Sequence, residues 1–192
     1  MLLPVKLFQV SGDMEVKMRK EQYTIPNVDF VFREDGEFVT KTVDDLFAGK
    51  RVVIFSLPGA FTPTCSAYQL PGFEEKYEEF DALGIDAIYC ISVNDAFVMN
   101  AWAKDQGIKN VQLIPDGNAY FTRSMGMLVN KSNLGFGERS WRYAAVVKDG
   151  IIEKMFVEPG QRDNAPEDPY VETTPENVLS YIRSSALELE LV

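Results

Sequence analysis

The segment PGAFTPTC, Pro58 to Cys65, holds the residues best suited to chemistry in a chain of 192 residues with two cysteines and no histidine. Cys65 follows Thr62 by three residues, just behind a Thr-Pro step. Thr62 and Pro63 are typical of the N-cap and first residue of a helix, which places Cys65 in the first turn. Free N–H groups and the positive end of the helix dipole stabilise a thiolate there. Cys65 is therefore either a nucleophile or an inert thiol buried at a helix start.

The lack of histidine limits what this cysteine can do. The chain can form neither a Ser-His-Asp nor a Cys-His catalytic group, and two cysteines do not make the usual structural zinc sites, so we expect no metal or cofactor. A helix terminus contributes only about 0.3–1 kcal/mol at an exposed site. This contribution is too small to ionise most of an ordinary thiol at neutral pH, so a cation must help to stabilise the thiolate. Arg142 is the best candidate and Arg139 the second, because both lie where the polar ERSWR passes into the apolar YAAVV.

The second cysteine, Cys90, lies in the apolar segment IDAIYCISV. Its place three residues from the expected strand end, Val93, puts it about 10 Å inside the strand. A disulfide needs Cα atoms within about 7 Å, so pairing with Cys65 would require local unfolding. Cys90 is either a core residue or a thiol that resolves an oxidised Cys65.

Two apolar runs predict the central strands that position these cysteines. RVVIFSL before the Cys65 helix and IDAIYCISV after it are apolar on both faces, which is typical of buried parallel strands, and the helical sequence between them makes a βαβ unit. Asp35-Gly36 and Asp149-Gly150 each separate two apolar-alternating runs and predict hairpins. The second hairpin covers SWRYAAVVKDGIIEKMFVE.

The helix signals complete the predicted fold. Thr42 and Gly49 are typical of the start and end of a short helix, and Thr174-Pro175 of the start of the last one. Pro71 is expected to kink or break the Cys65 helix after about two turns. The order of elements predicts an α/β, thioredoxin-like fold with a mixed central sheet flanked by helices. We expect an N-terminal arm at 1–22, one domain at 23–185 and a C-terminal tail at 186–192.

Composition and net charge limit the binding partners and the cellular compartment that we expect for this chain. The net charge of −10 and the lack of a basic stripe argue against nucleic-acid binding. No window approaches the roughly 20 apolar residues of a membrane span. The apolar start MLLPVKLFQV is interpreted as an edge-packing arm, with a weak targeting segment as the alternative. Two cysteines do not form a secreted disulfide framework, so a reducing, cytoplasmic location is expected.

Three separated blocks carry a family resemblance. PGAFTPTC matches the P-x-x-x-T-x-x-C motif of peroxiredoxins, and SLPGAFTPTCS with LPGF, CISVNDAFVMNAWAKD and GFGERSWRYAAVVKDG resemble the type II, peroxiredoxin-five-like branch of that family. The likeness covers about Tyr23 to Arg183. It implies a thioredoxin-like fold and thiol-dependent reduction of hydrogen peroxide and alkyl hydroperoxides.

The resemblance also implies roles for single residues. Cys65 corresponds to the peroxidatic cysteine, Thr62 to the threonine that contacts thiolate and peroxide, and Pro58 to the proline that shields the pocket. Arg142 corresponds to the arginine that stabilises the thiolate and polarises the peroxide. Cys90 matches a resolving cysteine of plant members, although animal relatives have a cysteine there and resolve elsewhere. Gln69 replaces a histidine found in many type II members.

By the same resemblance we expect a homodimer packed near the active-site end. Glutathione with glutaredoxin, or thioredoxin, would act as reductant in trans, since this chain carries no fused glutaredoxin domain of the kind found in some bacterial relatives. The alternative function is a non-enzymatic redox sensor or relay with the same fold. Such a protein would oxidise at Cys65 but would not turn over with any thiol reductant.

Overall fold

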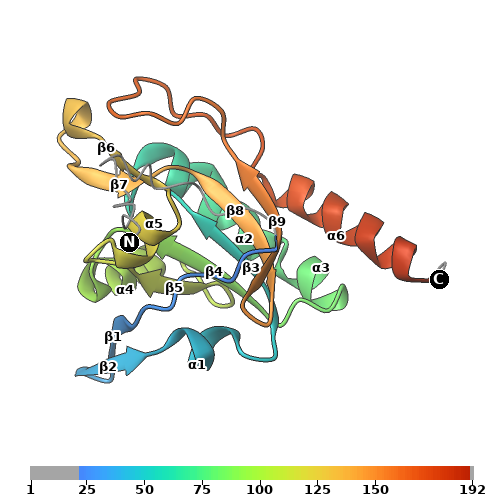
Figure 1. Cartoon of the computed structure of the whole chain (residues 1–192). Coiled ribbons are helices and arrows are strands. Elements are labelled where there is room, and N and C mark those ends of the chain that lie inside the picture. The colour runs from blue at the N-terminus through green and yellow to red at the C-terminus, as the bar shows by residue number, and fades with distance from the viewer. Residues whose placement is uncertain (1–21, 191–192) are drawn as a thin grey trace, which may run out of the picture.

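The computed structural model describes residues 22–190, and a five-stranded sheet lies at its centre (Figure 1). The strand order is β5-β4-β3-β8-β9, where the bounds are Arg51–Ser56 for β3, Ala87–Ser92 for β4, Gln112–Pro115 for β5, Tyr143–Lys148 for β8 and Ile151–Val157 for β9. β3 is parallel to β4, and β4 to β5, whereas β8 is antiparallel to both of its neighbours. The predicted α/β, thioredoxin-like fold with a mixed sheet is confirmed.

Alternating side chains of β3 and β8 divide the apolar core into two layers. Val52 and Ile54 of β3 lie in the cluster that also holds side chains of the hairpin β1–β2 and of α1 and α5. Val53 and Phe55 lie in the opposite cluster, with side chains of α2, α3, α4 and α6. Because successive residues of a strand point to opposite faces, a strand covered on both sides must be apolar throughout. This is why the middle of β3, VVIF, is an unbroken apolar run.

The helices cover both faces of this sheet. Their bounds are Val43–Phe47 for α1, Leu70–Glu75 for α2, Tyr77–Ala82 for α3, Ala96–Asp105 for α4, Tyr120–Ser124 for α5 and Pro175–Glu190 for α6, with a π-helical turn η1 at Cys65–Gln69 and a 3₁₀ turn η2 at Ser132–Leu134. Figure 1 shows α6 projecting to one side of the sheet, away from the hairpin β1–β2. In the part of the chain that the structure describes, no helix is long and apolar enough to cross a membrane.

The predicted turns are confirmed. Asp35-Gly36 joins β1, Phe30–Glu34, to β2, Glu37–Lys41, and Asp149-Gly150 joins β8 to β9. In both pairs φ is positive at each residue, as a type I′ hairpin turn requires. Thr42 caps α1 in a capping box: its hydroxyl accepts from the N–H of Asp45, whose carboxylate accepts from the N–H of Thr42.

Of the kink or break expected at Pro71, the break is wrong. The helix that begins at Pro63 continues through the proline to Glu75. The N–H of Leu70 donates to the carbonyl of Cys65, five residues earlier, so the helix widens into the π turn η1 just before Pro71. A proline ring normally clashes with the carbonyl four residues before it, and the wider turn leaves room for the ring.

Two further boundaries differ from expectation. The segment before β8 is not one strand, because β7, Glu138–Ser140, pairs with β6, Leu128–Asn130, and the chain leaves both sheets at Trp141 and Arg142. We expected a separate C-terminal tail at 186–192, but α6 extends to Glu190, so residues 186–190 belong to that helix. The predicted arm at 1–22 lies outside the described residues except for Gln22, whose N–H donates to the carbonyl of Ile152.

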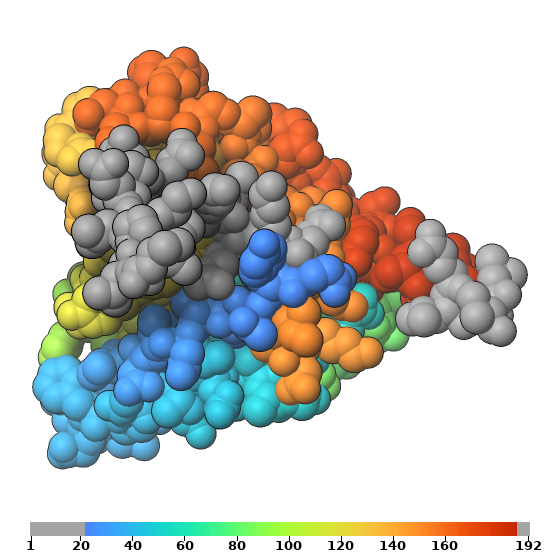
Figure 2. Space-filling model, viewed as in Figure 1, coloured from blue at the N-terminus to red at the C-terminus, as the bar shows by residue number. Residues whose placement is uncertain are grey.

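The segments that enclose the sheet are visible on the surface (Figure 2). The chain from residue 22 through the hairpin β1–β2 runs along the lower part of this face, and the loop after β9 forms its upper part. Thr24 forms an antiparallel bridge with Ile151, which ties the start of the described chain to β9.

Candidate active site

Cys65 lies at the start of the helix that follows β3, as the Thr-Pro step predicts. Its side chain is fully buried. The N–H of Ser66 donates to the carbonyl of Thr62 at 3.0 Å, so Thr62 holds the N-cap position and Cys65 is the third helical residue. The hydroxyl of Thr62 does not cap the helix: it donates to the carbonyl of Gly59 at 2.7 Å. The oxygen of Thr62 therefore keeps its lone pairs for another donor.

The loop between β3 and this helix is held against the end of β4. The N–H of Ala60 donates to Oδ1 of Asn94 at 3.0 Å, and the hydroxyl of Ser92 donates to the same oxygen at 2.6 Å. Pro58 is buried in this loop. Phe61 has a φ of 64°, a strained backbone conformation for a residue with a large side chain, and its ring is exposed. The fold thus maintains this loop against a local energetic cost.

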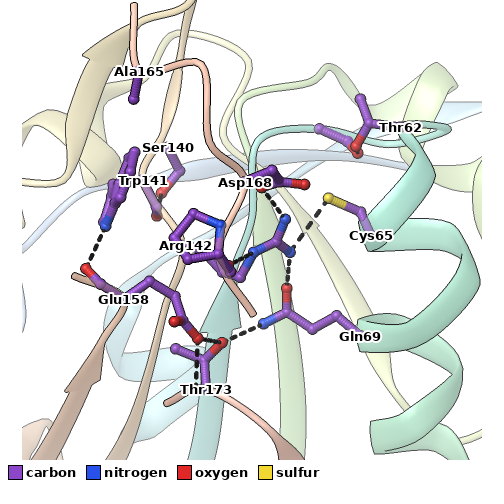
Figure 3. A network of polar contacts seen from close by, with 12 residues as sticks. Thr62, Cys65, Gln69, Ser140, Trp141, Arg142, Glu158, Ala165, Asp168 and Thr173 are labelled. Carbon is purple, nitrogen blue, oxygen red and sulfur yellow. Dashed lines mark hydrogen bonds and ion pairs between the residues drawn. The ribbon is translucent and has the colours of Figure 1, made fainter. Parts of the chain in front are cut away.

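The guanidinium of Arg142 lies beside the sulfur of Cys65 (Figure 3). Its Nη1 donates to Sγ of Cys65 at 3.6 Å and also to Oε1 of Gln69. Its Nε donates to the carbonyl of Pro169 at 3.0 Å, and its Nη2 forms an ion pair with Asp168 at 2.5 Å. All three guanidinium nitrogens are therefore bonded, which fixes the orientation of the planar group.

The charge of Arg142 is retained although its side chain is only 1% exposed. Burial lowers the pKa of this guanidinium, but the attraction of Cys65 and of Asp168, together with the hydrogen bonds to both, raises its pKa overall. A buried cation within bonding distance of a thiol stabilises the thiolate over the neutral form. The sequence-predicted pair of Cys65 and Arg142 is brought together.

Gln69 connects this pair to a buried carboxylate. Its Nε2 lies 3.5 Å from the hydroxyl oxygen of Thr173, which in turn donates to Oε1 of Glu158 at 2.9 Å. Gln69, Thr173 and Glu158 are all buried. The amide of Gln69 thus links Arg142 to a buried polar network.

Arg139 lies near the site but does not contact the sulfur. Its Nε donates to the carbonyl of Phe136 at 2.9 Å and its Nη1 to the carbonyl of Val93 at 3.3 Å. The guanidinium packs on Gly59, where a Cβ would come within 2.7 Å of Nη1. Arg139 therefore supports the loop before Cys65 and adds a positive charge behind it.

Cys90 is buried in the core beneath the site, and both cysteines are free thiols. β4 ends at Ser92 rather than Val93, so Cys90 lies two residues from the strand end. Burial, followed by the proximity of Cys65, raises the pKa of Cys90 well above its ordinary value. Cys90 is thus a neutral thiol that no solvent reaches while the chain is folded.

Sequence reasoning missed the residues after β9 that bond Arg142 directly or through Gln69. Asp168, Pro169, Thr173 and Glu158 lie in or beside the loop PGQRDNAPEDP and its continuation, which the sequence marks only as polar and rich in proline. Within residues 22–190, no group of three or more His, Cys, Asp or Glu is arranged to hold a metal ion.

A buried cysteine at a helix start, bonded to a buried arginine in a thioredoxin-like fold, defines the site of a thiol enzyme. Comparison with known protein families supports this class of protein, because the model of the Redoxin family matches residues 20–173. A peroxiredoxin of Rhizobium etli is 63% identical over 146 residues, which cover 76% of this chain and 82% of the relative.

Two more distant proteins show the same relationship. The hybrid peroxiredoxin hyPrx5 of Haemophilus influenzae is 49% identical over 158 residues, covering 82% of this chain and 64% of the relative. The crystal structure of the Plasmodium falciparum antioxidant protein, described as a 1-Cys peroxiredoxin, superposes with a TM-score of 0.83 at 42% identity, covering 86% of this chain and 99% of that one. The chain belongs to the peroxiredoxins, in the type II, peroxiredoxin-five-like branch, and is a thiol peroxidase.

Proposed function

We propose that the thiolate of Cys65 is the peroxidatic nucleophile and that Arg142 holds both the thiolate and the hydroperoxide. The observation that supports this most strongly is the 3.6 Å contact between Sγ and Nη1, with both side chains buried. A planar guanidinium can donate to a sulfur anion and to a peroxide oxygen at once. Its charge is in place before the reaction, so it stabilises the transition state without reorganisation.

The proposed step balances without a cofactor. The Cys65 thiolate attacks the terminal oxygen of the hydroperoxide, so that an S–O bond forms while the O–O bond breaks. The leaving oxygen takes a proton and departs as water or alcohol. Cys65 becomes a sulfenic acid, oxidised by two electrons, and the peroxide is reduced by the same two.

Thr62 and Pro58 are assigned supporting roles. The hydroxyl of Thr62 already donates to the carbonyl of Gly59, so its oxygen can accept the O–H of an incoming hydroperoxide. That bond would turn the terminal oxygen toward Sγ. Pro58 is buried in the loop and supplies no N–H, which fits a role in shielding the pocket from water.

We propose that the sulfenic acid is reduced by an external thiol, in a cycle that does not need Cys90. Cys90 is buried and its pKa is raised, so it reacts poorly with Cys65 in the folded chain. The likeness to a protein described as a 1-Cys peroxiredoxin supports the same cycle. Glutathione with glutaredoxin, or thioredoxin, then acts in trans: the first thiol forms a mixed disulfide and releases water, and a second thiol frees Cys65.

Steady-state peroxidase assays with each reductant test this proposal. Cys65→Ser should abolish turnover with both, whereas the matched variant Cys90→Ala should keep it within about threefold with at least one. Turnover by Cys65→Ser would overturn the assignment of the nucleophile. A wild-type protein that oxidises at Cys65 but turns over with neither reductant would instead be the sensor or relay.

We also propose a homodimer packed near the active-site end, in a reducing, cytoplasmic setting. The exposed rings of Phe61 and Phe97 support the dimer, because they lie on adjacent segments joined by the bond between Ala60 and Asn94. Light scattering should give twice the chain mass, and Phe61→Ser with Phe97→Ser should return the monomer. Two cysteines are too few for a secreted disulfide framework, which supports a reducing compartment that fractionation of the source cells can check.

A further inference from the structure

The loop from 159 to 174 supplies two of the partners that orient Arg142. It joins β9 to α6 and contains no helix or strand over its 16 residues. Asp168 accepts from Nη2 of Arg142 and the carbonyl of Pro169 accepts from Nε. Figure 3 shows Asp168 on the guanidinium beside the sulfur of Cys65. A loop of this length holds a side chain in one place only if it is itself anchored.

Buried polar side chains provide that anchoring. Oε1 of Glu158 accepts from the N–H groups of Val171, Glu172 and Thr173, each at 2.9 Å. The carbonyl of Glu158 accepts from Nε1 of Trp141 at 2.8 Å, next to Arg142 in the chain.

Lys131 fixes the middle of the same loop. Its side chain is buried, its Nζ donates to the carbonyl of Ala165 at 3.4 Å, and it lies over the ring of Trp141. Lys131 and Oε1 of Glu158 are each bonded to the backbone of the loop, so these buried side chains anchor it at two places, although Oε2 of Glu158 has no hydrogen-bond partner among the described residues.

We propose that Asp168 is a positioning residue for Arg142 and that Glu158 holds Asp168 in place. The proposal rests on the role assigned above to Arg142. During the catalytic cycle the charge of Cys65 disappears when the thiolate becomes a sulfenic acid, and a buried guanidinium without a counter-charge is unfavourable. The carboxylate of Asp168 does not take part in the proposed oxidation, and its side chain is partly exposed to solvent. It therefore keeps Arg142 in the geometry that the next peroxide needs.

Ping-pong kinetics separate positioning from general destabilisation, because the peroxide and the reductant react in different half-reactions. Asp168→Ala should lower kcat/KM for hydrogen peroxide about tenfold and leave kcat/KM for the reductant within twofold. Asp168→Asn, which keeps an acceptor oxygen without the charge, should lose only about threefold. Glu167→Ala is the matched control: Glu167 is the adjacent acid in the same loop and pairs with Arg162 on the surface.

The anchor is tested by Glu158→Ala, which removes the acceptor of three loop N–H groups and should give the same selective loss as Asp168→Ala, with little further loss when the two are combined. Glu158→Gln, which keeps an acceptor oxygen, should lose less. The proposal is overturned if Asp168→Ala keeps its peroxide kcat/KM within twofold of wild type, or if both kcat/KM values fall together. Cys65→Ser, assayed alongside, distinguishes the failures: activity in that variant refutes the nucleophile, whereas an inactive Cys65→Ser with a fully active Asp168→Ala refutes only the positioning role.

Discussion

Cys65 and Gln69 contact the same nitrogen of Arg142 from the two ends of one π-helical turn. The amide oxygen of Gln69 is neutral, so it orients Nη1 without cancelling the charge that the thiolate needs. A carboxylate in its place would compete with the thiolate for the same guanidinium.

Gln69→Glu should therefore make Cys65 less reactive. A second negative charge beside the sulfur disfavours the thiolate, and we expect the rate of alkylation by iodoacetamide at pH 7 to fall about tenfold, or about 1.4 kcal/mol. The measurement is made in a Cys90→Ala background, so that one thiol reports. Gln112→Glu, an exposed change at the start of β5, should leave the rate unaltered. Equal rates for Gln69→Glu and its control would contradict this role of the amide.

Replacing Pro71 should separate stability from reactivity. Pro71→Ala supplies a missing N–H and removes the ring that the π turn accommodates, so the helix can return to α-helical hydrogen bonding. The melting temperature should stay the same or rise, while the peroxide rate constant falls about threefold or more because Cys65 and Gln69 no longer share Nη1. Stopped-flow fluorescence gives the rate constant. A Pro71→Ala protein with a lower melting temperature and an unchanged rate would show that the π turn has no such role.

Local signals predicted much of the fold. Asp35-Gly36, Asp149-Gly150 and Thr42 each act on the residues next to them, and all three form the predicted turns and cap. The apolar runs around Val53 and Cys90 are also local signals, and they predicted the buried strands β3 and β4. The π turn that carries the helix through Pro71 was not predicted, because a π turn leaves no mark in residue type.

The site was predicted only in part because half of it depends on tertiary contacts. Cys65 and Arg142 lie beside strong local signals, a Thr-Pro step and a strand start. Asp168 and Glu158 lie in and before a loop without periodicity, and only the folded chain brings them to Arg142. The hydroxyl of Thr62 shows the converse, since its position was predicted but its partner, the carbonyl of Gly59, was not.

Stability at alkaline pH should report the burial of Cys90. Burial raises the pKa of this thiol in the folded state, whereas the unfolded chain has an ordinary value of about 8.5. Above that pH the unfolded state loses a proton that the folded state keeps, so the stability present below about pH 8.5 is lost as the pH rises, at about 1.4 kcal/mol per pH unit.

Urea unfolding between pH 7 and 11 provides the measurement. In Cys90→Ala the decline should begin only near pH 10, where tyrosines start to ionise in the unfolded chain; burial raises the pKa of Tyr89 and of Tyr170 to about 12. A decline in Cys90→Ala that begins at the same pH as in wild type would show that Cys90 does not cause it.

The central claim, that the guanidinium of Arg142 holds Cys65 as a reactive thiolate, is tested most directly by the rate constant for oxidation of reduced protein by hydrogen peroxide in wild type and Arg142→Lys. An ammonium cannot bond Cys65, Gln69, Asp168 and the carbonyl of Pro169 at once. We expect the rate constant to fall at least about a hundredfold, or about 2.7 kcal/mol, with the fold intact by circular dichroism. A value within threefold of wild type would contradict the claim.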